Sequence, residues 1–140
     1  MASESALIVA VPEAETHVAE LRRRCDFRSS EGLPAHITVL HPFVPHPVPA
    51  SDRLRLAQLI GRVRPFAFRL TTIARWPDNV HLRPEPAAPF VALTRSVWTA
   101  FPAYPPYEGR FADIVPHLSV AQGATRLLDV AEEALCDLFP

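Results

Sequence analysis

Lysine is absent from this chain, and its fourteen basic residues are all arginines. Fifteen acidic residues bring the net charge to −1. The chain therefore lacks the basic excess of proteins that bind many phosphates of a long duplex. We expect a small nucleotide or an RNA terminus as the partner instead. Arginine does bind phosphate bidentately, but a bias in codon composition explains its excess more simply.

Long apolar runs and common site motifs are also missing. The N-terminal apolar run covers only residues 6–11, too short for a signal peptide or a membrane span, so we expect a cytoplasmic protein without a membrane partner. Cys25 and Cys136 lack zinc-site spacing and occupy apolar helix positions, which predicts buried free thiols. The GxxxxGK, GxGxxG, HExxH and GxSxG patterns are absent, which leaves nucleoside triphosphate, dinucleotide, zincin and hydrolase-elbow sites without support.

Apolar periodicity predicts an α+β fold of one domain. The expected strands cover 6–11, 36–40, 66–72, 80–83 and 117–121, and the expected helices cover 14–25, 51–64, 89–101 and 125–138. Ser51 is the expected N-cap of the second helix. The proline-rich residues 42–49 and residues 102–116 are expected to form loops, and a turn at 76–79 closes a hairpin.

A short motif occurs twice, each time just after a proline and at the start of a predicted strand. The triplet HIT at 36–38 recurs as HLS at 117–119. Side chains two residues apart in a strand share a face, so His36 should lie beside Thr38, and His117 beside Ser119. Two imidazoles and two hydroxyls could line one cleft, where they could move protons beside a phosphate.

With these motifs in view, the chain resembles the 2H phosphoesterase superfamily, specifically its 2′-5′ RNA ligase branch. The mark of that family is two copies of His-x-Thr/Ser-x, met here at 36–39 and 117–120. The flanking segments PAHITVLHPF (34–43), PPYEG (105–109) and VPHLSVA (115–121) are also similar to the branch. The resemblance covers nearly the whole chain. One departure is His41, which stands where many relatives carry tyrosine; strand alternation turns it away from His36.

The resemblance implies one two-lobed domain over 1–140, with an active-site groove between two pseudo-symmetric lobes of antiparallel sheet and outer helices. The first lobe would cover about 1–50 and the second about 66–140. Relatives usually continue into further strands after the last helix. Either this branch is short, the sequence is clipped, or a partner chain covers the exposed sheet edge. The oligomeric state is open.

The resemblance also implies an enzyme that needs no metal and no cofactor. It would act on a 2′,3′-cyclic phosphate or a 2′-5′ linkage at a nucleotide or RNA end. His117 would be the general base and His36 the general acid, while Thr38 and Ser119 would donate hydrogen bonds to phosphate oxygens. Hydrolysis and ligation both remain open as the direction of the reaction.

Two alternatives and two further residues complete the predictions. A module that binds RNA ends or nucleotides without turnover would use the same groove. A metallohydrolase would use His41, His46 and a carboxylate, although two histidines in a proline-rich loop are weak evidence for a metal site.

His81 alternates with apolar neighbours in a hairpin strand and could contact substrate, or it could face solvent. Tyr107 could bind substrate by stacking on a base, or simply pack.

Overall fold

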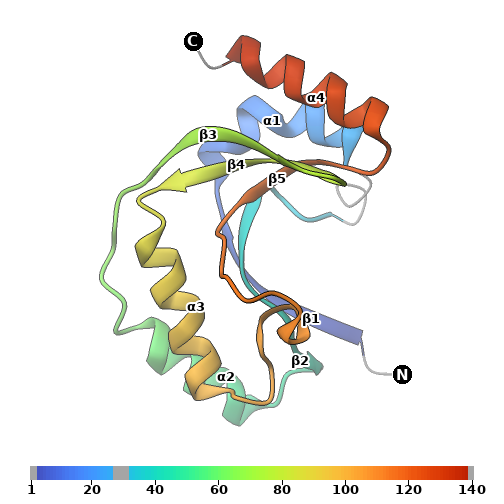
Figure 1. Ribbon diagram of the computed structural model, residues 1–140. Helices are drawn as coiled ribbons and strands as arrows, with labels where there is room; N and C mark the ends of the chain where they lie inside the picture. Colours follow the sequence, from blue (N-terminus) through green and yellow to red (C-terminus); the bar gives the residue numbers. More distant parts are fainter. Residues whose placement is uncertain (1–2, 27–31, 139–140) are drawn as a thin grey trace. The chain divides into compact units, whose positions relative to one another are not determined.

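A computed structural model describes residues 3–26 and 32–138 of the chain (Figure 1). Its elements, in chain order, are β1 (Ser3–Ala10), α1 (Pro12–Cys25), β2 (His36–His46), α2 (Ala50–Ile60), β3 (Arg69–Trp76), β4 (Asn79–Glu85), α3 (Ala88–Ala100), a 3₁₀ turn η2 (Pro106–Gly109), β5 (Leu118–Gln122) and α4 (Thr125–Leu138).

The five strands form one sheet in the order β1-β2-β5-β4-β3, and the β2–β5, β5–β4 and β4–β3 pairs are antiparallel. The α+β class with an antiparallel sheet is thus confirmed. The two strands that carry the repeated motif, β2 and β5, are direct neighbours although they are far apart in the sequence. Two pseudo-symmetric lobes with a groove between them stay a prediction.

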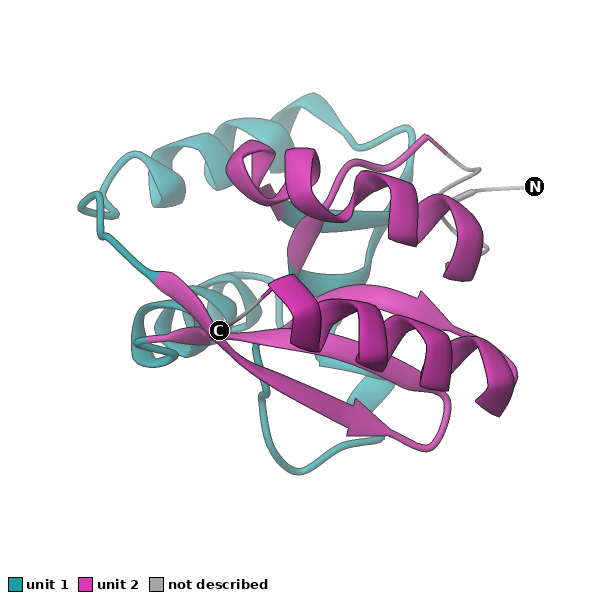
Figure 2. Ribbon diagram, turned by 90° about the horizontal axis from the view of Figure 1, so that it is seen from above, with its two compact units in different colours: residues 1–8, 38–68, 86–116 teal, residues 9–37, 69–85, 117–140 magenta. Residues whose placement is uncertain are grey.

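Contacts within the chain divide it into two compact units (Figure 2). Unit 1 comprises residues 1–8, 38–68 and 86–116, and unit 2 comprises residues 9–37, 69–85 and 117–140. Each unit is built from three separate segments of the sequence. The boundary on β2 falls between Ile37 and Thr38, inside the first motif.

Unit 2 packs two helices on one side of three strands. Helices α1 and α4 contact β5 and each other (Figure 1). Pro12 starts α1, and the acidic first turn and the arginines of its last turn complement the helix dipole. The fully buried side chains of this unit include Val18, Cys25, Ile37, Val80, Leu82, Leu118, Val120, Leu128 and Leu135.

Unit 1 contains most of β2, both remaining long helices and the long loop before β5. Helix α3 buries the face that its periodicity predicts, formed by Phe90, Leu93, Thr94 and Val97. The Thr94 hydroxyl donates to the Val39 carbonyl at 2.7 Å, which ties α3 to β2. The loop 102–116 is confirmed, apart from its short 3₁₀ turn.

Besides the start of β1, which lies at Ser3 instead of residue 6, three predicted boundaries are wrong. Strand β2 does not end at residue 40 but continues through Pro42 to His46, so its second half is not the expected loop. Strand β3 begins at Arg69, because the Phe66 and Phe68 rings pack edge-on against Phe90 at centroid distances of 5.1 and 4.9 Å instead of extending the strand.

The third boundary concerns α2, which begins at Ala50 with Pro49 as its N-cap and ends at Ile60, so Ser51 lies inside the helix. The thiol prediction holds for Cys25, which is buried, and is wrong for Cys136, which is exposed on α4. No helix among the described residues is long and apolar enough to cross a membrane.

Candidate active site

The apolar side of the motif strands fixes which side chains face the other way. Leu118 of β5 pairs with Ile37 of β2 and with Leu82 of β4. All three side chains are fully buried, and α1 and α4 pack against β5. Because side chains alternate along a strand, the neighbours of these residues face the opposite side of the sheet.

On that opposite side the strand register gathers the polar motif residues of unit 2. His81 of β4 pairs directly with Ser119 of β5. Continuing the β2–β5 register by one residue sets His36 across from Ser119 on its other side. His117 precedes Ser119 by two residues and shares its face. The strand pairing and the ring contacts thus bring His81, Ser119 and the His117 ring together in unit 2. That His36 lies on the same face rests on strand alternation and stays a prediction.

The His117 ring lies in a cluster of three rings. Its centroid is 4.7 Å from the Trp76 ring and 5.1 Å from the His81 ring, and both contacts are edge-on. The Trp76 and His81 rings are themselves 4.2 Å apart. Such contacts limit the rotation of the His117 imidazole, so it is held in place before any substrate binds. Trp76 thus packs against two histidine rings of unit 2.

The His36 ring is oriented by the backbone just before it. Its Nδ1 is 2.7 Å from the Pro34 carbonyl oxygen. A carbonyl only accepts, so Nδ1 carries the proton and donates it. In the neutral ring Nε2 then has the lone pair of a base, and in the charged ring Nε2–H is an acid. Either proton-transfer role is open to this atom.

A buried ion pair holds the segment that leads into His36. Arg22 of α1 is only 3% exposed, and its guanidinium lies 3.3 Å from the Glu15 carboxylate and donates to the Leu33 carbonyl at 3.0 Å. The Glu15 carboxylate also accepts the backbone N–H of Ala35. Residues 33–35 are thus bound to α1 on both sides of Pro34, the partner of the His36 ring.

His81 is fully buried, and side chains occupy both of its ring nitrogens. Nδ1 is 2.9 Å from Asn79 Oδ1, and Arg83 Nε donates to Nε2 at 3.2 Å. Burial, together with the charges of His117 and Arg83, lowers the pKa of His81 from 6.5 to about 4. The ring is therefore neutral near pH 7. Direct contact between His81 and a substrate stays a prediction.

Asn79 is a site residue that the sequence did not reveal. The sequence places it in a turn, whereas it opens β4 and its Nδ2 donates to the Ser119 hydroxyl at 2.9 Å. The only local signal is its spacing of two residues from His81, which puts both on one strand face. Its partner Ser119 is distant in sequence, so only the strand register identifies the pair.

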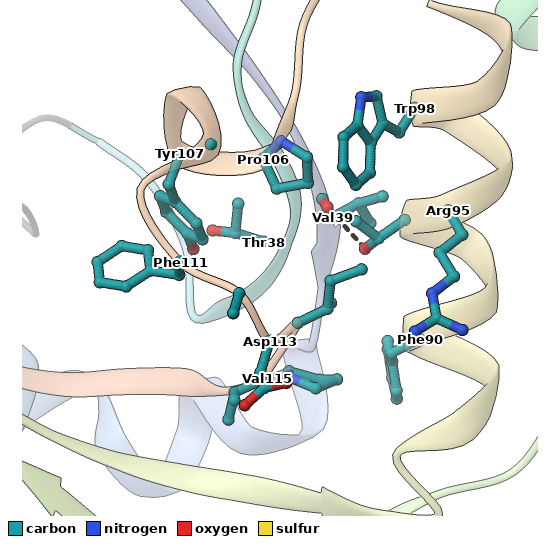
Figure 3. Close-up of a pocket in the computed structure, with 15 residues that line it drawn as sticks. Thr38, Val39, Phe90, Arg95, Trp98, Pro106, Tyr107, Phe111, Asp113 and Val115 are labelled. Atoms are coloured by element: carbon teal, nitrogen blue, oxygen red, sulfur yellow. Dashed lines mark hydrogen bonds between the residues drawn. The ribbon is translucent and has the colours of Figure 1, made fainter. Parts of the chain in front are cut away.

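Thr38 and Tyr107, the other predicted site residues, both line a pocket of unit 1 with a volume of about 430 Å³. In Figure 3 they lie on one side of it with Phe111, while Trp98 and Arg95 project from α3 on the other. The Tyr107 ring packs edge-on against Phe111 at 5.7 Å. The partnership of Thr38 with His36 rests on strand alternation and stays a prediction.

The backbone at Tyr107 is strained. Tyr107 and Glu108 have φ of 50° and 58°, a region that side chains disfavour, and Gly109 continues the left-handed turn at 78°. Two such non-glycine residues in succession are unusual and cluster at functional sites in proteins. The turn fixes where the Tyr107 ring stands at the pocket wall, which suits a binding residue. Substrate binding by Tyr107 stays a prediction.

The metal alternative depends on residues of unit 1. His41 Nε2 lies 3.3 Å from the Glu4 carboxylate. Over residues 3–26 and 32–138, no group of three or more His, Cys, Asp or Glu side chains is arranged to hold a metal ion. The paired His41 and Glu4 alone do not supply the three ligands that a catalytic zinc site generally uses.

Comparison with known families gives an independent result. The family model of the 2′-5′ RNA ligase superfamily matches residues 10–140, which includes both motif strands and every residue of the three-ring cluster. The comparison with curated proteins gave no match. Since the family match spans nearly all of the sequence, the chain belongs to the 2′-5′ RNA ligase superfamily, a group of 2H phosphoesterases.

Proposed function

We propose that this chain is a metal-independent phosphodiesterase that acts on 2′,3′-cyclic phosphates or 2′-5′ linkages at nucleotide or RNA ends. His36 and His117 act as its general acid and base. The proposal is supported by the strand register, in which Ile37 pairs with Leu118 and His81 pairs with Ser119. With alternation along the strands, this register predicts that both motif histidines share the face of Ser119. Membership of the superfamily supports the same chemistry.

The spacing of the two histidines suits a phosphate group. If the Ile37–Leu118 register continues by one residue on each side, His36 and His117 become diagonal neighbours, and the Cα atoms of such residues lie roughly 7–8 Å apart. A tetrahedral phosphate fits between two rings at that separation with a hydrogen bond to each. Ser119, directly across from His36, then stands where it can donate to a non-bridging oxygen as negative charge develops.

For a cyclic phosphate the proposed step is a hydrolysis. The neutral imidazole takes a proton from water while the water oxygen forms a bond to phosphorus. The bond between phosphorus and one ribose oxygen breaks, and the charged imidazole gives its proton to that oxygen. The products are a phosphomonoester and a free ribose hydroxyl. We assign the base to His117 and the acid to His36 on the family resemblance alone.

The test is turnover of 2′,3′-cyclic mononucleotides by the purified chain in the presence of a chelator. Chromatography of the products separates 2′- from 3′-phosphomonoesters and so identifies the leaving oxygen. His36→Ala and His117→Ala should each abolish most turnover. His17→Ala is the matched control, because His17 is exposed on α1, away from the strands. Full activity in either motif variant would overturn the proposal.

Two other outcomes would favour the alternative functions. Saturable nucleotide binding without turnover would favour the binding module. Turnover lost in chelator and restored by a divalent ion would favour the metallohydrolase.

A panel of substrates defines the partner. In line with the near-zero net charge, we propose a small nucleotide or an RNA terminus as the partner rather than a long duplex. We also propose that the protein acts in the cytoplasm. The panel should compare cyclic mononucleotides, RNA ending in a cyclic phosphate, a 2′-5′ oligomer and an ADP-ribose cyclic phosphate. Equal cleavage of a long duplex would contradict this choice of partner.

A further inference from the structure

We propose that Arg83, His81 and Asn79 form a one-way hydrogen-bond relay that fixes the Ser119 hydroxyl as a donor facing the two motif histidines. All four side chains belong to unit 2, on β4 and β5. In this proposal Arg83, His81 and Asn79 are positioning residues, and Ser119 alone touches the substrate. The part that concerns catalysis rests on the proposed function; the direction of the relay does not.

The direction of the relay is set at its first bond. Arg83 Nε–H can only donate, and it lies 3.2 Å from His81 Nε2. Nε2 must therefore be the unprotonated nitrogen of the ring. The single proton of the neutral ring is then on Nδ1, which lies 2.9 Å from Asn79 Oδ1. The burial of His81 and the adjacent guanidinium both disfavour a second ring proton.

The second step fixes the Asn79 amide. Because His81 Nδ1–H donates, the group that faces it must be the amide oxygen, and the amide nitrogen faces the other way. That nitrogen is 2.9 Å from Ser119 Oγ. An amide nitrogen has no lone pair to offer, so Ser119 Oγ accepts this bond. The orientation of Asn79 thus follows from the arginine at the far end.

The last step concerns the Ser119 proton. Since Oγ accepts from Asn79, the hydroxyl proton cannot point at Asn79 and must turn to the rest of its surroundings. These include His117, two residues earlier, and His36, which lies across from Ser119 if the Ile37–Leu118 register continues by one residue. A donor oriented in advance stabilises developing charge without reorganising during the reaction. A serine without the relay would spread over three staggered rotamers.

The first experiment reads the relay without any substrate. Two-bond proton–nitrogen correlation spectra of the ¹⁵N-labelled full chain report which ring nitrogen of His81 carries the proton. At neutral pH we expect a neutral ring protonated on Nδ1. Protonation on Nε2, or a doubly protonated ring, would overturn the relay whatever the enzyme does with substrates.

The second experiment reverses the relay with Asn79→Asp. The aspartate still accepts a hydrogen bond from His81, but it presents Ser119 with an acceptor in place of a donor. The Ser119 hydroxyl therefore donates to the new carboxylate and no longer to the substrate. On a cyclic nucleotide we expect kcat to fall about 100-fold, as for loss of one oxyanion donor, with little change in KM. Ser119→Ala should lose about as much as this variant.

The double variant distinguishes positioning from a merely structural role. In a Ser119→Ala background, Asn79→Asp should leave kcat unchanged, because no hydroxyl remains to orient. An equal fall of kcat in both backgrounds would overturn the relay. Repulsion between the new carboxylate and an anionic substrate would instead persist in the alanine background, raise KM and weaken with salt.

Failure of the relay and failure of the proposed function give different results. If the parent turns over no substrate on the panel, the proposed function fails, while the His81 proton position still decides the relay. If the parent turns over substrate but the double variant shows no coupling, the relay fails alone. Should Asn79→Asp not fold, the spectrum of the parent chain remains a decisive test.

Discussion

The two motif segments look alike in sequence, yet different chemistry supports each of them. The charged pair Arg22–Glu15 of α1 hydrogen-bonds to the backbone before His36. That backbone then orients the His36 ring through the Pro34 carbonyl. Around His117 and Ser119 the support comes from neighbouring side chains, namely the rings of Trp76 and His81 and the amide of Asn79.

Because of this difference, variants around the two motifs should have different effects, one on stability and the other on kcat. The support of His36 is part of the packing of α1 on the sheet, so damage to it should appear mainly as lost stability. The support of Ser119 is a chain of directional hydrogen bonds on the polar face, so damage to it should appear mainly in kcat. The two motifs therefore carry the same kinds of side chain but are held in place by different interactions. The following variants test that contrast.

The largest expected effect is loss of either motif histidine. His36→Ala and His117→Ala should each lower kcat by roughly 10²–10⁴-fold, since each removes one proton-transfer partner. The double variant should be little worse than either single one, because the two groups act as a unit. Steady-state kinetics on a cyclic nucleotide measures this, and simple multiplication of the two losses would contradict a shared step.

Denaturant titration of the same variants adds a contrast. His117→Ala should also lose roughly 1 kcal/mol of folding stability, because its ring packs against two others. His36→Ala should lose less, since its ring contact is one hydrogen bond to the backbone. A larger loss for His36→Ala would reverse the proposed contrast between the two segments.

The next effect is on stability alone and concerns the buried pair. Arg22→Met should lower the free energy of unfolding by about 2–4 kcal/mol, since it leaves the Glu15 carboxylate and the Leu33 carbonyl without their partner. Arg23→Met is the matched control: Arg23 is 71% exposed, and its pair with Glu20 should contribute at most about 0.5 kcal/mol. Equal losses in both variants would show that the buried pair of Arg22 and Glu15 does not stabilise the segment before His36.

The sequence predicts most of the helices and strands well and several of their boundaries poorly. Periodicity identifies α1, α3 and α4, because each presents apolar residues at helical spacing to a core. It misses the second half of β2, since proline and histidine there suggest a loop. Edge or irregular strand positions tolerate proline, and only the tertiary pairing shows that this stretch is extended.

The candidate site divides in the same way. The repeat is a local pattern, so His36, Thr38, His117 and Ser119 could be named from sequence. The relay depends on which residue of β4 stands opposite Ser119, and a shift of register by one residue would turn His81 to the other face. Register is a property of long-range packing, which explains why Asn79 looked like a turn residue.

A pH-dependent effect of intermediate size should report the burial of His81. Its pKa is lowered from 6.5 to about 4. Between these values the unfolded chain binds a proton that the folded chain does not. The free energy of unfolding therefore falls as the pH drops from about 6.5 to about 4, and the full contribution of His81 is present above pH 6.5. Relative to pH below about 4, that contribution at neutral pH is on the order of 3 kcal/mol.

The measurement compares unfolding of the parent with that of His81→Gln across this range, because glutamine does not titrate. Subtracting the two curves of unfolding free energy against pH cancels the titration of the carboxylates that both proteins share. As the pH falls from about 6.5 to about 4, the free energy of unfolding of the parent should decrease relative to that of His81→Gln. A difference that does not change with pH would mean that His81 is protonated equally in both states.

The smallest expected effects come from exchanging the two hydroxyl residues that the repeat makes equivalent. Thr38→Ser removes one methyl group and keeps the hydroxyl, so kcat should change by less than about three-fold. Ser119→Thr also keeps the hydroxyl, but it adds a methyl beside the Asn79 amide and restricts χ1, where Oγ must accept in one direction. We expect roughly a ten-fold loss of kcat, on the order of 1.4 kcal/mol. Steady-state kinetics of both variants on one cyclic nucleotide measures the asymmetry. If Ser119→Thr were as well tolerated as Thr38→Ser, the two motifs would be supported alike, and the direction imposed by Asn79 would have no consequence for the reaction.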